Sequence, residues 1–338
     1  MLSSRQKLIL KAIIEDYIET VEPVGSKVLT EKPYLDFSSA TIRADMQFLE
    51  EKGYLEKTHT SSGRVPSEQG YKYYVNHLLT RDSEIVNYYP MIDEIFENNY
   101  LTKEEAIKQA LDLFANITGY MVIALGASAN FSKVKKMEIV PLTDTEAILL
   151  IVTNSGHVQN QRITIPEGFK MEDMLRLIGM FDVAVYDHSI NEINEILMKE
   201  ARKPRIRQMV DFQDEIFSFL IKAFSKFTTG EYYTSGLRLL FNQPEFHNHE
   251  SMEKIINLVD NNMFMNILQN CEDGLTVKIG SENLDEQIDN CSLVSIPYYI
   301  NDDAYGVICT IGPVRMEYRK VFPLIEYIAS SMRKLYKR

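Results

Sequence analysis

Ala40, Arg43, Ala44 and Gln47 recur at a spacing that places them on one face of a helix, counting about 100° per residue. Arginine can bridge O6 and N7 of guanine, and glutamine can bridge N6 and N7 of adenine. Alanine suits a thymine methyl group and lets a helix approach the floor of a DNA groove. An ordinary solvent-exposed helix face would accept the same residues, so this pattern alone leaves both interpretations open.

An acid-free loop follows this helix. Its sequence, KTHTSSGRVPS from Lys57 to Ser67, offers two cations and a run of hydroxyl groups. Hydroxyls, backbone N–H groups and a few cations are what proteins use to contact phosphate. Gly63 is expected to give the tip of a hairpin its φ > 0 backbone. The predicted DNA-contact residues are Ser39, Ala40, Thr41, Arg43, Ala44 and Gln47 in the helix, and Lys57, His59, Thr60, Ser61, Ser62, Gly63 and Arg64 in the loop.

Two preceding helices are expected to support these residues. Ser3 and Gln6 fit a capping box, and apolar residues at helical spacing predict a first helix from about Ser4 to Thr20. Ser26 is expected to cap a short second helix, from Lys27 to Lys32, which a proline then ends.

A third helix carries the face described first. Ser38 or Ser39 is expected to cap it, and it should run to about Lys52, with Gly53 as the left-handed residue at its end. The side chains expected to pack on the first helix are Ile42, Met46 and Leu49. Three helices followed by a hairpin predict a winged helix-turn-helix, with the helix in the major groove and the wing on the flanking backbone.

The net charge of −12 is unevenly distributed. Residues 1–80 hold ten Lys/Arg and eleven Asp/Glu, a net of −1, so the rest of the chain carries −11. A near-neutral module can still bind phosphate through cations grouped on one face. No apolar run reaches the roughly 20 residues of a membrane span and no secretory signal is evident, so we expect a cytoplasmic protein without a membrane partner. Three widely spaced cysteines predict buried, reduced thiols.

With 338 residues, the chain has room for two or three domains. After a connector from about Thr80 to Leu101, the expected helix is TKEEAIKQALDLFANI and the expected strands are YMVIAL, KKMEIVPL, EAILLIVTN, HVQNQRITIP, LTVKIG, SLVSIPYYI and YGVICTIG. A mainly helical stretch with a break at Pro204 separates the two groups of strands, and a closing helix is expected from Arg315 to Tyr336. This pattern predicts an α+β domain with an insertion. The large apolar residues of the helical stretch suit either a core or a dimer surface: Leu175, Leu177, Ile178, Met180, Phe181, Phe217, Phe219, Leu220 and Phe224.

Two long segments carry motifs typical of one protein family. The first is FSSATIRADMQFLEEKGYLEKTHTSSGRVPSEQGYKYYV, and the second is CSLVSIPYYINDDAYGVICTIGPVRMEYRKVFPLIEYI, which contains Gly312, Pro313, Arg315, Met316 and Tyr318. Both segments resemble the HrcA heat-inducible transcription repressors. Shorter matches between them include NSGHVQNQ, LFNQPEF and LTVKIGSEN. The resemblance implies an α+β protein with a winged helix-turn-helix domain at 1–80, a GAF-like α/β domain at 81–145 and 225–338, and an inserted dimerising α+β domain at 146–224.

The same resemblance implies a function. HrcA-like proteins are homodimeric repressors that bind the CIRCE inverted repeat upstream of the operons for GroE and DnaK chaperones. They are released from double-stranded DNA on heat stress, and the GroEL chaperonin modulates their activity. A two-fold symmetric repressor of this kind reads a palindromic site.

Other functions stay open from the residues alone. The domain implied to be GAF-like could sense a metabolite, or the winged helix could serve only protein contacts. His247, His249 and Glu250 are the nearest approach to a metal cluster, and they are expected in a solvated loop. No Gly-rich phosphate loop, nucleophile elbow or C-x-x-C pair occurs, so we expect neither an enzyme nor a cofactor.

Overall fold

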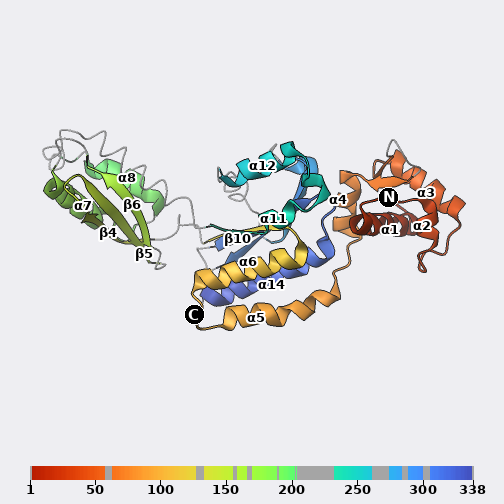
Figure 1. The fold of residues 1–338 in the computed structure, drawn as a ribbon, viewed down its shortest axis with the longest axis horizontal. Helices are drawn as coiled ribbons and strands as arrows, with labels where there is room; N and C mark the ends of the chain where they lie inside the picture. Colours follow the sequence, from red (N-terminus) through yellow and green to blue (C-terminus); the bar gives the residue numbers. More distant parts are fainter. Residues whose placement is uncertain are drawn as a thin grey trace. The chain divides into compact units, whose positions relative to one another are not determined.

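The computed structural model describes residues 2–57, 63–126, 133–154, 158–165, 170–188, 190–201, 203, 232–260, 274–283, 288–299 and 305–336. The chain divides into two compact units (Figure 1). The first unit comprises Met1–Ala124, Tyr233–Tyr298 and Val307–Arg338, and the second comprises Leu125–Tyr232 and Tyr299–Gly306. The second unit is therefore inserted into the sequence of the first.

Helix α1, Ser4–Thr20, has the predicted bounds and the predicted capping box, in which the Gln6 N–H donates to Ser3 Oγ and the Ser3 N–H donates to Gln6 Oε1. Helix α2 spans Ser26–Thr30, and the expected capping role of Ser26 is wrong. Gly25 is the N-cap residue, and the Ser26 hydroxyl instead lies 3.0 Å from that of Ser39. A side-chain bond to a neighbouring helix has replaced the local cap.

Helix α3, Ser39–Glu51, is capped by Ser38, whose Oγ accepts from the Thr41 N–H. Gly53 follows it with φ 79°, as predicted. Strands β1, Leu55–Lys57, and β2, Arg64–Pro66, pair antiparallel and form the predicted hairpin, and α4, Glu68–His77, completes this N-terminal part. The apolar side of α3 packs on α1, as predicted, through Ile42, Met46 and Leu49.

The predicted connector is largely helical, as η1, Ser83–Tyr88, and α5, Tyr89–Glu97. Asp82 caps the first of these with its side chain, and Ile92 and Phe96 are buried one turn apart in the second. The four-residue spacing of Ile92 and Phe96 was not recognised in the sequence, because tyrosines and acidic residues surround both positions. The connector is therefore a packed element, which contacts α6 and α14.

The rest of the first unit is a five-stranded sheet in the order β7–β3–β10–β9–β8 with helices packed around it. The strands are β3 Met121–Leu125, β7 Tyr232–Ser235, β8 Thr276–Ile279, β9 Cys291–Tyr299 and β10 Tyr305–Pro313. The helices are α6 Lys103–Thr118, α11 Leu237–Leu240, η3 Pro244–Phe246, α12 His249–Asp260, η4 Gly280–Glu282 and α14 Tyr318–Tyr336. Figure 1 shows α5, α6 and α14 lying alongside one another.

Helix α14 begins at Tyr318 and not at the expected Arg315, which lies in the turn after β10. The helix contains Pro323, which has no N–H to give to the carbonyl four residues earlier, that of Arg319. The Asp82 N–H donates to this carbonyl instead, at 3.1 Å. The predicted apolar face is buried: Phe322, Ile325, Ile328, Ala329 and Met332.

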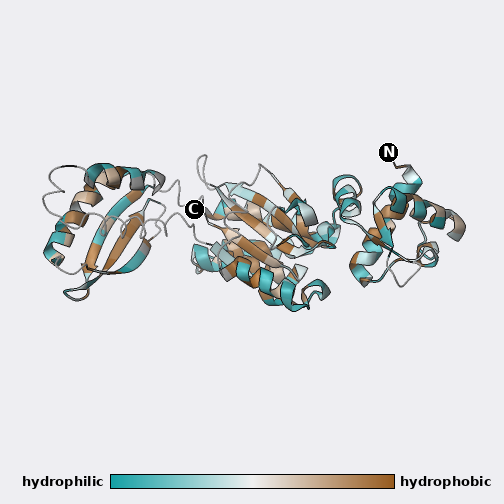
Figure 2. Cartoon of the chain, turned by 90° about the horizontal axis from the view of Figure 1, so that it is seen from above, coloured by the Kyte–Doolittle hydropathy of each residue, from teal (hydrophilic) through white to brown (hydrophobic). Residues whose placement is uncertain are grey.

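In the second unit, strands β4 Val134–Pro141, β5 Glu146–Thr153 and β6 Val158–Thr164 form an antiparallel sheet beside α7 Met171–Val185 and α8 Ile190–Ala201. The expected insertion, 146–224, lies within this unit, which starts earlier in the chain because β4 pairs along its length with β5. Figure 2 shows hydrophobic residues along these strands.

The helical residues of the second unit divide between core and surface. Leu177, Ile178 and Phe181 are buried against the sheet, whereas Leu175 is 43% exposed. Pro204, Phe217, Phe219, Leu220 and Phe224 lie outside the described residues. Across the described parts of both units, no helix is long and apolar enough to span a bilayer.

Candidate nucleic-acid interface

The outer face of α3 is open to solvent. Ala40, Arg43, Ala44 and Gln47 are all exposed. Within the same helix, Ile42 and Leu49 are 0% exposed. The apolar spacing therefore fixes the rotation of α3 about its axis, and that rotation turns the four side chains outward. The Gln47 amide donates to Glu51 Oε1 at 3.1 Å within the helix.

Asp45 holds α3 on α1, a role that the sequence reading did not find. Its carboxylate is 6% exposed, and Arg5 Nε donates to it at 2.6 Å. The Gln6 amide approaches the same carboxylate at 3.4 Å. A buried charge needs such partners. The signal was available in the sequence, because Asp45 lies between Ile42 and Met46 on the apolar face.

The first turn of α3 is held by hydroxyl groups. The Thr41 hydroxyl lies 2.9 Å from that of Ser38, and the Ser39 hydroxyl bonds to that of Ser26 on α2. Ser39 and Thr41 are only half-exposed. The Ser39 contact therefore fixes the start of α3 against α2, whereas the Thr41 contact is local to the start of the helix.

Arg64 is tied to the domain on two sides. Its Nε donates to Glu50 Oε2 on α3 at 2.6 Å, and its side chain is 16% exposed. Its backbone exchanges two hydrogen bonds of 2.9 Å with Val24, so β2 pairs with the chain between α1 and α2 as well as with β1. These contacts make Arg64 the link that fixes the base of the wing against α3.

Gly63 is required for a different reason from the predicted one. Its φ is outside the left-handed region, so the expectation of a φ > 0 turn at this residue is wrong. A Cβ at this position would lie 2.7 Å from the Pro23 carbonyl oxygen. Close approach of the Pro23 backbone is what excludes a side chain here. Lys57 at the end of β1 is exposed, and His59, Thr60, Ser61 and Ser62 lie outside the described residues.

The expectation that His247, His249 and Glu250 lie in a solvated loop holds for His247 but is wrong for the other two, which begin α12. His249 begins α12, far along the chain, and its Nδ1 lies 3.6 Å from Glu253. Among the residues that the structure describes, no group of three His, Cys, Asp or Glu side chains could hold a metal ion. Cys291 and Cys309 are buried thiols.

Two protein-family models match this chain, one near its start and one over most of the rest. The DeoR-like helix-turn-helix domain matches residues 10–66, and the HrcA protein C terminal domain matches residues 104–322. The chain belongs to the HrcA family. Its HrcA relatives include the heat-inducible transcription repressor HrcA of Acholeplasma laidlawii (strain PG-8A), which is 44% identical, with 100% of this chain and 98% of the relative covered.

A second HrcA relative, from Onion yellows phytoplasma (strain OY-M), is 38% identical over 99% of this chain and 98% of its own. A crystal structure described as that of a hypothetical protein matches with a TM-score of 0.61 and 22% identity, covering 99% of this chain and 97% of that one. This structural match supports the fold alone.

Proposed function

We propose that this HrcA family member is a heat-inducible transcription repressor that binds double-stranded DNA through its N-terminal winged helix. The observation that carries the proposal is the outward face of α3, where an arginine and a glutamine stand exposed on a helix held by its opposite, buried face. In this arrangement Arg43 and Gln47 read base edges in the major groove. Lys57 and the hydroxyl-rich loop that follows it contact the flanking backbone. Arg64, paired with Glu50, holds the base of the wing in place for these contacts.

The repressor acts as a homodimer in the cytoplasm. One winged helix reads only a few base pairs, and two related by a two-fold axis read an inverted repeat. We assign dimerisation to the second unit, as an inserted dimerising domain, and the part of the first unit that follows residue 80 to a GAF-like domain. The operator is the CIRCE inverted repeat upstream of the GroE and DnaK operons.

The GroEL chaperonin keeps the repressor competent, and heat stress withdraws that assistance. Folding assistance can control activity when a protein's competent population is small without it. No cofactor takes part in this cycle, and no catalytic step is needed.

An electrophoretic mobility experiment on a CIRCE duplex, with and without GroEL, tests the proposal. We expect a shifted complex with the inverted repeat, a weaker one with a scrambled duplex, and a larger bound fraction when GroEL is present. Binding to protein partners without affinity for any duplex would instead favour a winged helix used for protein contacts. A small molecule that changes duplex binding in place of GroEL would favour a metabolite sensor.

A further inference from the structure

The start of α4 contacts η4, Gly280–Glu282, in the part of the first unit that follows residue 80, which we call the sheet domain. The Glu68 carboxylate accepts from the Ser281 N–H at 3.1 Å and from the Ser281 hydroxyl at 2.7 Å. It lies against Gly280, where an added Cβ would overlap the carboxylate. The Glu68 carboxylate therefore packs closely against Gly280 and is bonded to Ser281. One helical turn further along α4, Lys72 Nζ lies 3.2 Å from Glu282.

A second set of contacts holds the chain as it leaves the winged helix. Arg319 Nε donates to the Thr80 carbonyl at 3.1 Å, and the Arg319 carbonyl, left without its helical partner by Pro323, accepts from the Asp82 N–H at 3.1 Å. Between them, Arg81 makes a two-pronged pair with Glu326 at 2.5 and 2.7 Å. Consecutive residues are thus fixed by backbone and side-chain bonds.

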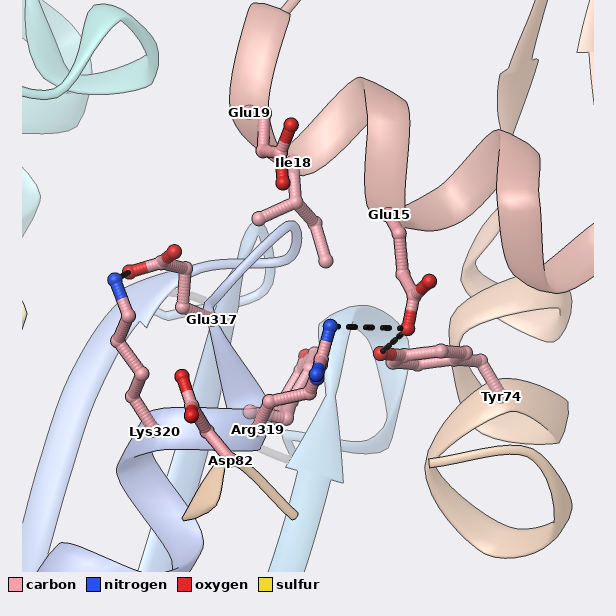
Figure 3. Close-up of a pocket in the computed structure, with 9 residues that line it drawn as sticks. Glu15, Ile18, Glu19, Tyr74, Asp82, Glu317, Arg319 and Lys320 are labelled. Atoms are coloured by element: carbon pink, nitrogen blue, oxygen red, sulfur yellow. Dashed lines mark hydrogen bonds and ion pairs between the residues drawn. The ribbon is translucent and has the colours of Figure 1, made fainter. Parts of the chain in front are cut away.

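The guanidinium of Arg319 also reaches α1. Figure 3 shows it pointing toward Glu15, and the two are 3.5 Å apart. The Tyr74 hydroxyl of α4 donates to the same Glu15 carboxylate at 3.2 Å. Arg319 therefore contacts both α1 and the segment after α4, and it belongs to α14 of the sheet domain.

Arg315 fixes the start of α14 for this purpose. Its side chain is 8% exposed, and its Nε and Nη2 pair with the Glu245 carboxylate at 2.6 and 3.1 Å. Its Nη1 points to the Ile18 carbonyl of α1 at 3.5 Å. Buried arginines paired in two places hold a fixed geometry. Arg315 therefore ties the turn that precedes α14 both to Glu245 of the sheet domain and to α1.

We propose that these contacts form a joint that sets the angle of the winged helix and so selects the distance between the two half-sites that a dimer can bind. The joint consists of Glu15, Glu68 and Lys72 on the winged helix and of Gly280, Ser281, Glu282 and Arg319 on the sheet domain. This inference rests on the proposed function. Linking two winged helices raises affinity only where both can bind their half-sites at the same time. The joint therefore makes the distance between half-sites a determinant of specificity.

The polar nature of the joint matters to this role. Arg319 is 44% exposed and Glu282 is 42% exposed, so water competes for these ion pairs. Such contacts favour one orientation of the winged helix but are broken more easily than a large apolar interface. Affinity for the correctly spaced repeat is therefore expected to fall with salt more steeply than the phosphate contacts of the two half-sites together predict, because the joint also loosens.

Gly280→Ala tests the joint. The new methyl group overlaps the Glu68 carboxylate and displaces it from its bonds with Ser281. The matched control is Gly274→Ala, because Gly274 also has a left-handed backbone, with φ 92° against 55° at Gly280, yet nothing lies within 4 Å of its added Cβ. Glu68→Ala tests the same contact from the winged-helix side, where it cannot strain the sheet domain.

Full-length variants are titrated against a series of inverted repeats with altered spacers and against a single half-site. We expect Gly280→Ala and Glu68→Ala to lose about tenfold affinity at the best spacing and to flatten the spacing preference, with half-site affinity within about twofold of the parent. Gly274→Ala should match the parent throughout. An unchanged spacing preference in both joint variants would overturn the proposal, as would an equal loss on the half-site.

Amide hydrogen exchange separates this result from the proposed function. In the parent the Ser281 amide is protected by Glu68, and both joint variants should speed exchange at 276–283 and at the start of α4 without any DNA present. If the parent binds no duplex, the proposed function fails. Unchanged amide exchange in both variants would show that the joint contacts do not hold the two parts together, and it would overturn the joint as well. Faster exchange with the parent's spacing preference retained would show a contact that does not set spacing, and this too would overturn the inference.

Discussion

At the scale of single residues, Arg43 and Arg64 have different surroundings, so their substitutions should have different effects. Arg43 is exposed on the outer face of α3, whereas Arg64 is paired with Glu50. We expect Arg43→Ala to lose about 1–3 kcal/mol of binding and to relax the preference at one base position. Arg64→Ala should weaken binding to all sequences alike, because it holds the wing. Selection from a randomised duplex pool measures both, and an unchanged preference in Arg43→Ala would reject its reading role.

The thiol of Cys291 should be inert. Burial raises its pKa to about 12, mainly because the thiolate would lose its hydration. A pKa that is raised in the folded state stabilises the protein below the unfolded value, near 9, and that stabilisation is lost as the pH rises toward 12. We expect no alkylation by iodoacetamide at pH 8 in the native protein and full alkylation in urea. Peptide mass spectrometry reads this out, and fast native labelling would contradict the burial.

Residue patterns in the sequence predicted which side chains of α3 face solvent better than they predicted the contacts that hold α3 and the wing in place. The spacing of Arg43 and Gln47 sufficed to place them outward, because the apolar positions of α3 leave only one orientation. The partners of Asp45 and Arg64 could not be predicted, since Arg5 and Glu50 are brought to them by the packing of separate segments. The reason for Gly63 was misjudged because a close approach from Pro23 leaves no trace in local sequence.

At the scale of elements, caps were predictable where they are local. Ser3 with Gln6 acts within its own helix and was predicted from spacing, and Ser38 is one of the two serines that were expected to cap α3. Ser26 fails as a cap because a hydroxyl on another helix, that of Ser39, competes for it. The helices of the connector were missed because their buried positions are few and lie among polar residues.

The cap at Ser38 gives a test of the reading helix as an element. Ser38→Ala removes the acceptor for the Thr41 N–H and should cost about 1 kcal/mol of stability. Ser38→Asp keeps an acceptor at the N-cap and is the control. Thermal unfolding followed by circular dichroism compares the two. Equal melting temperatures for the alanine and aspartate variants would show that the start of α3 is held by its contacts with α2 instead.

At the scale of the whole molecule, the two units have separate cores and should unfold separately. Phe181 is 1% exposed in the core of the second unit, and Phe114 is 0% exposed in the first. Each Phe→Ala change should cost about 3–5 kcal/mol in its own unit. We expect calorimetry to show two transitions, with Phe181→Ala lowering one and Phe114→Ala lowering the other. A single transition lowered by both would show that the units unfold together.

The proline within α14 has a consequence for how this chain tolerates change. Because the vacant Arg319 carbonyl is filled by the main-chain amide of Asp82, any residue except proline at position 82 supplies the same bond. The side chain of Asp82 has its own role as the cap of η1, but the backbone bond to Arg319 depends only on the number of residues between α4 and η1. One residue inserted or deleted in that short stretch moves the amide by about 3.5 Å and empties the bond. We therefore expect natural variation to preserve the length of the segment that joins the winged helix to the rest of the protein.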